Sequence, residues 1–362
     1  MLTDKQNKKL KEHLTNAQNP LFFFDNDQDG LCSFLIFQRY LERGKGVPVK
    51  SFPDLDASYF RKIDELKADY IFILDKPVVS KSFWKKAEER NIPVVWVDHH
   101  ELQTQNHEET DVPDFVNYFN PLYDENMNKK QKEGEPVSVI CYDVVKNKKD
   151  LWLAVIGAIS DKFMPDYYDE FKKKYPELAC SKKDPSAFDV FYKSEVGKIA
   201  KMMGAGLKDR TTNVISMLRF LMSVKSPNEV LEESSKNYLM RRRFNQINGK
   251  YQKLLTKALE VENSSDDSKI LFFQYGGDLS ISSELSNELS YLFPEKYIVV
   301  IYVKTGIKAN ISGRGKNIKP KLLKAIEPLQ GATGGGHDDA VGAQIRVDDI
   351  ETFKTNLCCL LK

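Results

Sequence analysis

Short apolar runs alternate with amphipathic stretches through the first part of the chain. Four of the runs stand out, at residues 21–24, 70–74, 93–97 and 153–160. Runs of four to eight apolar residues between polar segments are typical of buried strands. Residues 31–41 predict a buried helix, and residues 81–90 predict a polar helix between two of the runs. This βαβ pattern predicts a parallel sheet that helices cover on both faces.

Each of the four apolar runs ends in residues that can bind a metal ion. In chain order these residues are Asp25, Asp27 and Asp29, then Asp75, then Asp98, His99 and His100, and finally Asp161. In open parallel sheets, ligands bind outside the carboxyl ends of the strands. Carboxylates so close together repel one another, and a divalent cation among them relieves the repulsion. The sequence therefore predicts four strands whose ends build one metal site along one edge of one sheet.

The first acidic motif has two simpler interpretations. Asp25, Asp27, Asp29 and Gly30 also match the opening of an EF-hand calcium loop, which needs a preceding helix and a Glu at its twelfth position. Here a Phe-rich run precedes the motif and Ile36 occupies the twelfth position. A solvated acidic turn without metal would explain this motif alone, but not the ends of the other three runs.

The second half of the chain changes character twice. Residues 163–262 are strongly charged and helical in pattern, which predicts the last helices of a first domain and a long connecting helix. The polar residues 263–268 predict a linker. Strand-like runs resume at 270–273 and 297–302. The glycine-rich residues 331–337 predict a flexible loop whose amides can approach a phosphate closely.

Composition narrows the class of protein. A chain of 362 residues has room for about two domains. The net charge is only +2, so any contact with nucleic acid must come from local basic patches. Five cysteines without a Cys-x-x-Cys pair indicate a reducing compartment and disfavour a zinc–thiolate site. No signal peptide and no run of about 20 apolar residues is evident. We therefore expect a soluble, cytoplasmic protein that does not bind membranes.

The order of these motifs resembles the DHH phosphoesterase superfamily, and within it the RecJ-like nucleases. The resemblance rests on Asp-x-Asp-x-Asp-Gly at 25–30, Asp75, Asp-His-His at 98–100, Asp161 and Gly-Gly-His at 335–337. Residues 311–314, Ile-Ser-Gly-Arg, are similar to the Ser-x-Arg signature of the DHH-associated C-terminal domain. The resemblance implies a two-lobed α/β protein. Its parts would be a parallel-sheet catalytic domain at 1–200, a helical connector and linker at 201–268, and a smaller α/β substrate-binding domain at 269–362.

The same resemblance implies roles for individual residues. Two divalent ions, Mn²⁺ or Mg²⁺, would be held by Asp25, Asp27, Asp29, Asp75, His99 and Asp161. Asp75 would bridge the ions. The catalytic residues would be His100, at the scissile phosphate, and Asp98, which orients an imidazole. A substrate phosphate or terminal nucleotide would be held by Ser312, Arg314, Gly335, Gly336 and His337.

The implied activity is metal-dependent hydrolysis of phosphodiester bonds at the end of single-stranded DNA or RNA, or in short oligonucleotides. Two alternatives stay open. One is a phosphoesterase for cyclic or linear dinucleotides or nucleotide bisphosphates, and the other is a non-catalytic replication scaffold. The chain lacks the length for the extra nucleic-acid-binding domain of bacterial RecJ, which favours a compact enzyme. The sequence leaves open the choice of DNA or RNA, the polarity of degradation, replication or repair partner proteins, and a homodimer.

Overall fold

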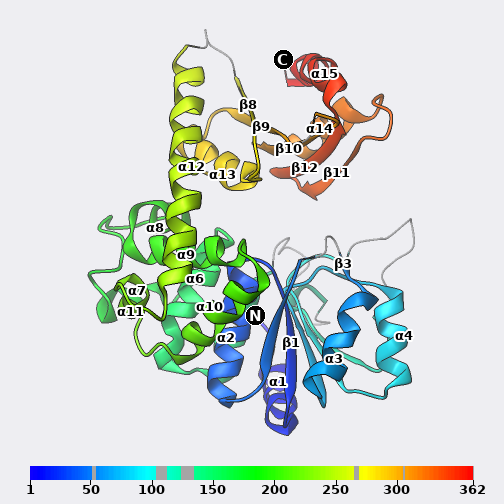
Figure 1. Ribbon diagram of the computed structural model, residues 1–362, viewed down its shortest axis with the longest axis vertical. Coiled ribbons are helices and arrows are strands. Elements are labelled where there is room, and N and C mark those ends of the chain that lie inside the picture. Colours follow the sequence, from blue (N-terminus) through cyan, green and yellow to red (C-terminus); the bar gives the residue numbers. More distant parts are fainter. Residues whose placement is uncertain (51–53, 103–111, 124–133, 265–268, 305, 362) are drawn as a thin grey trace. The chain divides into compact units, whose positions relative to one another are not determined.

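The computed structural model describes residues 1–50, 54–102, 112–123, 134–264, 269–304 and 306–361 (Figure 1). The chain divides into two compact units, Met1–Phe244 and Asn245–Lys362. Residues 265–268 of the predicted linker lie outside the described residues. Among the helices that the structure describes, none has the length and apolar character needed to span a membrane.

The first unit is built on a five-stranded parallel sheet with the strand order β2-β1-β4-β6-β7. Its strands are β1 (Pro20–Asp25), β2 (Lys45–Val49), β4 (Tyr70–Leu74), β6 (Val94–Val97) and β7 (Val116–Phe119). In the register, Phe24 pairs with Leu74, and Leu74 pairs with Val97. The residues that follow, Asp25, Asp75 and Asp98, therefore lie in one row across the carboxyl edge of the sheet. The predicted parallel sheet is confirmed, and so is its acidic edge for three of the four runs.

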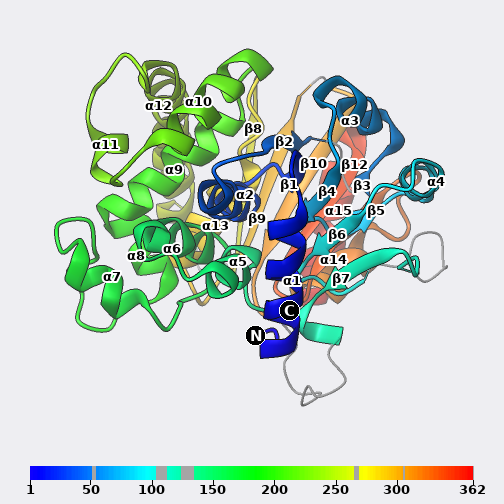
Figure 2. The same ribbon diagram turned by 90° about the horizontal axis from the view of Figure 1, so that it is seen from below.

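Helices cover both faces of this sheet (Figure 2). One face carries α1 (Asp4–Asn16), α2 (Gln28–Leu41), α5 (Val137–Val145), α6 (Leu151–Ser160) and α9 (Glu195–Leu207). The other carries α3 (Arg61–Leu66) and α4 (Lys81–Glu89). Phe22 and Phe24 pack into the first core while Phe23 packs into the second. Because successive strand residues point to opposite faces and both faces are covered, β1 is apolar from Pro20 to Phe24.

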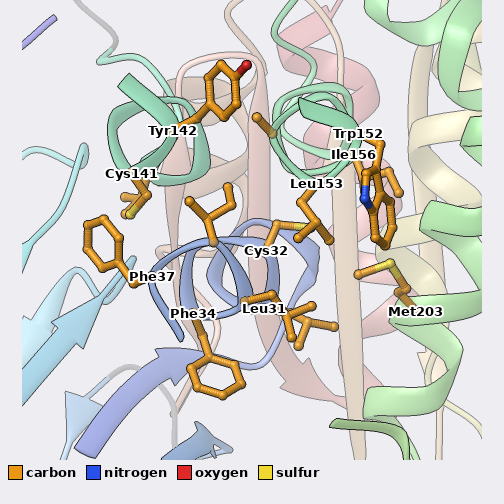
Figure 3. Packing of buried hydrophobic residues seen from close by; sticks show 14 of the residues in the cluster. Leu31, Cys32, Phe34, Phe37, Cys141, Tyr142, Trp152, Leu153, Ile156 and Met203 are labelled. Carbon is orange, nitrogen blue, oxygen red and sulfur yellow. The ribbon is translucent and has the colours of Figure 1, made fainter. Parts of the chain in front are cut away.

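The fourth apolar run is a helix, so its assignment as a strand was wrong. Residues Leu151–Ser160 form α6, and their side chains from Leu151 to Ala158 are fully buried. In Figure 3, Leu153 points toward Leu31 and Cys32 of α2, and Trp152 lies beside Met203 of α9. A helix buried on all sides has no polar stripe, and its sequence then looks like that of a buried strand. Asp161 consequently follows the end of a helix.

The charged middle of the chain is helical, as predicted. It contains α7 (Tyr168–Lys174), α8 (Ala187–Lys193), α10 (Thr211–Ser223), α11 (Asn228–Leu231) and the 26-residue α12 (Tyr238–Asn263). Val214, Leu221 and Met240 pack into the same core as α2 and α6. The first compact unit therefore extends well beyond residue 200. Short segments complete it: β3 (Asp54–Leu55), which pairs with β5 (Val78–Val79), and 3-10 turns at Ala57–Phe60, Pro121–Tyr123 and Lys148–Asp150.

The second unit has its own five-stranded sheet, in the order β11-β12-β10-β9-β8. Its elements are β8 (Ile270–Gly276), α13 (Ser282–Leu292), β9 (Tyr297–Val303), β10 (Lys308–Arg314), α14 (Ile318–Ile326), β11 (Thr333–His337), β12 (Ala340–Arg346), the 3-10 turn Val347–Asp349 and α15 (Ile350–Leu361). Only the β8–β9 pair is parallel among the described pairs of this sheet. Each unit thus has a separate hydrophobic core, as the two-domain α/β prediction requires.

The glycine-rich segment is mostly an edge strand and not the predicted loop. Residues Thr333–His337 form β11, which pairs antiparallel with β12. Gly336 has φ +138°, a conformation that favours glycine, and an added Cβ at Gly334 would lie 2.9 Å from Leu323. Glycines carry no alternating side chains, so the sequence pattern could not reveal a strand that backbone pairing alone defines.

Candidate metal centre

The first acidic motif joins the end of β1 to the start of α2. Asp25 is the last residue of β1, and Asp27 caps α2 by accepting a hydrogen bond from the Gly30 amide at 3.0 Å. An added Cβ at Gly30 would lie only 2.6 Å from the Asp25 carbonyl oxygen, so glycine is required for this close approach. The tight connection holds Asp25, Asp27 and Asp29 together at the carboxyl edge of the sheet.

Asp75 is held in a conformation that is rare for a residue with a side chain. It directly follows β4, has φ +59°, and is only 2% exposed. Its amide donates a hydrogen bond to the Val97 carbonyl at 3.0 Å, which ties the turn to β6. Its Oδ1 atom is buried and has no hydrogen-bond partner among the described residues. Strained residues and unsatisfied buried atoms are both concentrated at functional sites.

His99 presents one ring nitrogen to two carboxylates. Its Nδ1 lies 3.4 Å from the Gly134 carbonyl and donates a hydrogen bond to it in the tautomer that this contact favours. Its Nε2 lies 3.3 Å from Asp75 Oδ1 and 3.3 Å from Asp161 Oδ2. Nε2 is buried and has no hydrogen-bond partner among the described residues. Burial, and then the neighbouring His100, lower the pKa of His99, which favours the neutral imidazole that binds metals.

Two groups of side chains converge closely enough to hold an ion. One is Asp75, His99 and His100, and the other is Asp29, His99 and Asp161; in each, the ligand atoms lie within 4.8 Å of one another. Asp29 is fully buried and accepts hydrogen bonds from the amides of Val137 at 2.7 Å and Ser138 at 3.1 Å. These amides belong to the first residues of α5, so Asp29 also supplies acceptors for amides that have no partner within the helix. The shared His99 places the two groups side by side.

His100 forms a tight pair with Asp98. Its Nδ1 lies 2.8 Å from Asp98 Oδ1, and Asp98 is 1% exposed. Burial alone would lower the pKa of His100, but the charge and hydrogen bond of Asp98 outweigh it and raise this pKa to about 9. His100 is therefore a cation near neutral pH when no metal is bound. The Asn120 side chain donates to the His100 carbonyl at 2.8 Å and helps to fix this backbone.

The carboxyl groups at the edge repel one another strongly. Burial, and then the neighbouring aspartates, raise the pKa values of Asp27 and Asp75 well above the usual 3.8. The same causes raise the pKa of Asp161 to about 8. Without a cation, the ionised form of these carboxyl groups is therefore unfavourable in the fold.

One residue of this edge was missed by the sequence reasoning. Lys76 follows Asp75, is 1% exposed, and places its Nζ 2.8 Å from Asp25 Oδ1. The Trp96 indole donates a hydrogen bond to the Lys76 carbonyl at 3.0 Å. The available signal was a lysine between a strand-end aspartate and the apolar Pro77 and Val78, where a solvated side chain is not expected.

The second unit brings the C-terminal candidate residues into two rows. Arg314 and His337 both pair with Ala340, and Ser312 and Gly335 both pair with Gly342. Arg314 donates to the Asn287 side chain at 2.6 Å and to the Gly313 carbonyl at 2.7 Å. Ser312 is buried and its hydroxyl bonds to that of Ser282. Gly335, Gly336 and His337 are exposed.

Two acidic residues beside this row have structural roles. Asp339 Oδ1 accepts a hydrogen bond from the Asn317 amide at 2.7 Å, at the start of α14. The Asp338 carbonyl accepts one from the Lys319 amide. The Asp339 carboxylate is thus engaged at a helix N-terminus, which offsets its charge.

The comparison with protein families identifies the C-terminal part of the chain. The DHHA1 domain family matches residues 266–361. The chain has a RecJ-like DHH fold that is completed by a DHHA1 domain. No curated protein sequence matches the chain.

Solved structures share this fold across both units. RecJ from Thermus thermophilus in complex with Mn²⁺ is 17% identical with a TM-score of 0.65, and the match covers 98% of this chain and 53% of that one. The exonuclease RecJ bound to manganese is 16% identical with a TM-score of 0.63, covering 99% and 94%. CDC45 from Entamoeba histolytica is 9% identical with a TM-score of 0.54, covering 99% and 98%. The chain spans about half the length of the Thermus protein, and at these identities the likeness is one of fold.

The donor set of the first unit fits a divalent metal ion. Asp75 Oδ1 and His99 Nε2 are buried, face each other and have no hydrogen-bond partner among the described residues. A cation between them would satisfy both atoms and relieve the repulsion that raises the pKa values of Asp27, Asp75 and Asp161. Carboxylate oxygens combined with imidazole suit Mn²⁺ or Mg²⁺ better than thiolate-preferring ions.

Proposed function

We propose that this chain is a metal-dependent phosphodiesterase that hydrolyses single-stranded DNA or RNA from an end, as an exonuclease or oligonucleotidase. The observation that carries the proposal is the buried pair of Asp75 Oδ1 and His99 Nε2, 3.3 Å apart and without hydrogen-bond partners among the described residues. Such a pair costs the fold stability, and a bound cation is the reason to keep it.

In this proposal the edge of the sheet holds two ions. The proposed ligands are the aspartates of the first motif together with Asp75, His99 and Asp161. His99 belongs to both converging groups, and Asp75 belongs to the group that also contains His100. Bound ions of this kind lower the pKa of a water and neutralise the charge that develops on the phosphoryl oxygens.

His100 and Asp98 are the protein groups that we propose act beside the ions. The Asp98 carboxylate holds the Nδ1 proton of His100 and fixes the ring. The imidazolium can then donate from Nε2 to a non-bridging oxygen of the scissile phosphate, a charge-assisted hydrogen bond. Such a preset donor stabilises the transition state without reorganisation. Asp98 acts through His100 and is a positioning residue.

The DHHA1 domain would hold a phosphate or a terminal nucleotide of the substrate. Arg314 carries a fixed positive charge on β10, and His337 lies on the same cross-strand row. The small Ala340 between them leaves the row accessible for a phosphate or a terminal nucleotide. Ser312, whose hydroxyl bonds to Ser282, is proposed to support this surface from beneath.

A non-catalytic scaffold is the competing proposal, because CDC45 has the same fold. The acidic edge argues against it. A scaffold gains nothing from three carboxyl groups whose burial and mutual repulsion raise their pKa values. The reaction on dinucleotides or nucleotide bisphosphates needs the same metal edge, so substrate length has to be tested directly.

The test is digestion of end-labelled single-stranded DNA, single-stranded RNA and dinucleotides with Mn²⁺ or with EDTA. We expect mononucleotide products with Mn²⁺, none with EDTA, and none from the Asp75→Asn variant. Asp114→Asn serves as the matched control, since Asp114 is an exposed aspartate of the same unit. Cleavage of the dinucleotides alone would favour the small-nucleotide alternative. Hydrolysis that persists in EDTA would refute the metal mechanism, and rapid nicking of circular single strands would refute action from an end.

A further inference from the structure

Lys76 is a buried cation inside the acidic edge. It is among the largest fully buried side chains of the described residues, in a class otherwise made up of aromatic residues. Its Nζ lies 2.8 Å from Asp25 Oδ1, while the Asp25 side chain is 30% exposed. An ammonium group loses its hydration on burial, and a carboxylate within hydrogen-bond distance compensates for this loss. The Asp25 carboxylate lies within this distance of the Lys76 ammonium group.

We infer that Lys76 withholds Asp25 from the metal centre, so that Asp25 is the counter-ion of a buried lysine and not a metal ligand. The inference rests on the proposed metal-dependent function and changes its ligand set. The ions are then held by Asp27, Asp29, Asp75, His99 and Asp161. Lys76 is a positioning residue, because it acts through Asp25 and is too buried to touch a substrate.

The contacts of the first motif support separate roles for Asp25, as the counter-ion of Lys76, and for Asp27 and Asp29, as metal ligands. Asp29 belongs to one of the two converging groups, whereas Asp25 belongs to neither within the described residues. Asp27 also lies outside them, but its carboxylate accepts its hydrogen bond from the neutral Gly30 amide. A metal ion can compete with one neutral amide for Asp27. To recruit Asp25 it must compete with the buried ammonium group of Lys76 for the same carboxylate.

Charge repulsion acts in the same direction. A divalent ion on Asp25 would share a carboxylate with Lys76, and two cations on one small anion repel each other in a poorly hydrated site. The pair also removes one negative charge from those that face the ions. The centre therefore binds its ions less tightly than a bare row of carboxylates would, and it is less repulsive to an anionic phosphate.

The decisive variant replaces both partners at once. Asp25→Asn alone would remove a carboxylate from beside the Lys76 charge and weaken metal binding for either role of Asp25. The double variant Asp25→Asn/Lys76→Met removes one charge of each sign, and replacing a buried ion pair by neutral groups of similar size is often tolerated. Lys76→Met alone frees Asp25 for the ions. Asp27→Asn is the matched control, because it removes a proposed ligand two residues away.

The measurement is calorimetric titration of Mn²⁺ into the metal-free chain, with circular dichroism to confirm folding. We expect the double variant to bind Mn²⁺ within about threefold of the wild type, Lys76→Met to bind about tenfold more tightly or to take up an additional ion, and Asp27→Asn to bind at least tenfold more weakly. A tenfold or larger loss in the double variant would show that Asp25 is a ligand and would overturn the inference. Equal Mn²⁺ affinity of wild type and Asp27→Asn would remove Asp27 from the ligand set and overturn the proposed distinction between Asp27 and Asp25. No binding by the wild type would refute the proposed metal centre itself, and the inference with it. If Lys76→Met does not fold, the double variant still decides.

Discussion

Replacing Asp161 by asparagine should stabilise the metal-free protein, although it removes a proposed ligand. Burial and the neighbouring Asp29 raise the pKa of Asp161 from 3.8 to about 8, so its ionised form is unfavourable in the fold. At about 1.4 kcal/mol for each pKa unit, this corresponds to at most about 6 kcal/mol. Asp161 is 28% exposed and shares the repulsion with other carboxyl groups, so we expect a measured gain of about 1–3 kcal/mol in the free energy of unfolding.

The sign of the pH dependence follows from the direction of the pKa change. Below pH 3.8 the carboxyl group is protonated in both the folded and the unfolded state, and wild type and variant should be about equally stable. As the pH rises, the unfolded chain releases this proton first, and the wild type loses stability until the folded group ionises near pH 8. The advantage of Asp161→Asn in the free energy of unfolding should therefore grow between about pH 4 and pH 8 and then level off.

Urea unfolding followed by tryptophan fluorescence measures the free energy of unfolding of the first compact unit, which contains Asp161. The three tryptophans, Trp84, Trp96 and Trp152, all lie in the first compact unit, so the signal does not report on the DHHA1 domain. In EDTA at pH 8 the variant should unfold at higher urea concentration than the wild type. In Mn²⁺ at about 1 mM the order should reverse, because only the wild type keeps the full ligand set and is stabilised by binding.

Two results would refute the reasoning. One is a variant less stable than the wild type in EDTA at pH 8, which would mean that the Asp161 carboxylate holds the fold together. The other is an equal difference in stability at pH 4 and pH 8, which would mean that ionisation is not the cause. Asp114→Asn is the control for a general charge effect, and it should change the free energy of unfolding by less than about 0.5 kcal/mol at either pH.

Three further predictions follow from other parts of the structure. Asp75→Ala should abolish Mn²⁺-dependent hydrolysis in the digestion assay while the metal-free melting temperature holds or rises; a large drop in that temperature would make Asp75 a structural residue instead. Arg314→Ala should raise KM about tenfold to a hundredfold with little change in kcat, since a charge-assisted hydrogen bond contributes roughly 1.5–3 kcal/mol; an unchanged KM in steady-state kinetics would remove Arg314 from substrate binding. Gly157→Ala should destabilise the first unit by about 2 kcal/mol or more in urea unfolding, because the added Cβ would clash with Ser138 and approach Asp29 to 2.7 Å; a neutral outcome would show that α5 and α6 can move apart.

The sequence was most informative where an apolar strand ends in an acidic residue. The runs ending at Asp25, Asp75 and Asp98 are parallel strands whose ends lie in one row. They could be predicted because strands buried on both faces of a covered sheet are apolar throughout their buried length. The run ending at Asp161 was misassigned, because α6 is buried on every side and has no polar face to reveal its period. Asp161 still reaches His99, since the end of α6 lies at the same edge.

Partners distant in the sequence could not be predicted from local patterns. The pairing of Lys76 with Asp25 depends on the register of β1 and β4, and the amides that bind Asp29 belong to α5, more than 100 residues away. The Gly335–His337 segment was recognised as a candidate site, but its strand structure depends on pairing with β12. Residue identity indicated the chemistry, whereas three-dimensional neighbours decide which carboxylates are available for metal.

Asp29 has two roles, as a proposed metal ligand and as a partner of a helix N-terminus, and this affects how activity is inferred from sequence in proteins of this fold. Its carboxylate accepts hydrogen bonds from the amides of Val137 and Ser138 at the start of α5, whether or not an ion is present. A descendant that had lost catalysis would still need an acid at this position to build the helix. Retention of Asp29 is therefore poor evidence of an active enzyme. Asp75 and His99, whose facing atoms have no hydrogen-bond partner within the described chain, are freed from constraint once metal binding is lost, and they are the positions at which inactive descendants should diverge first.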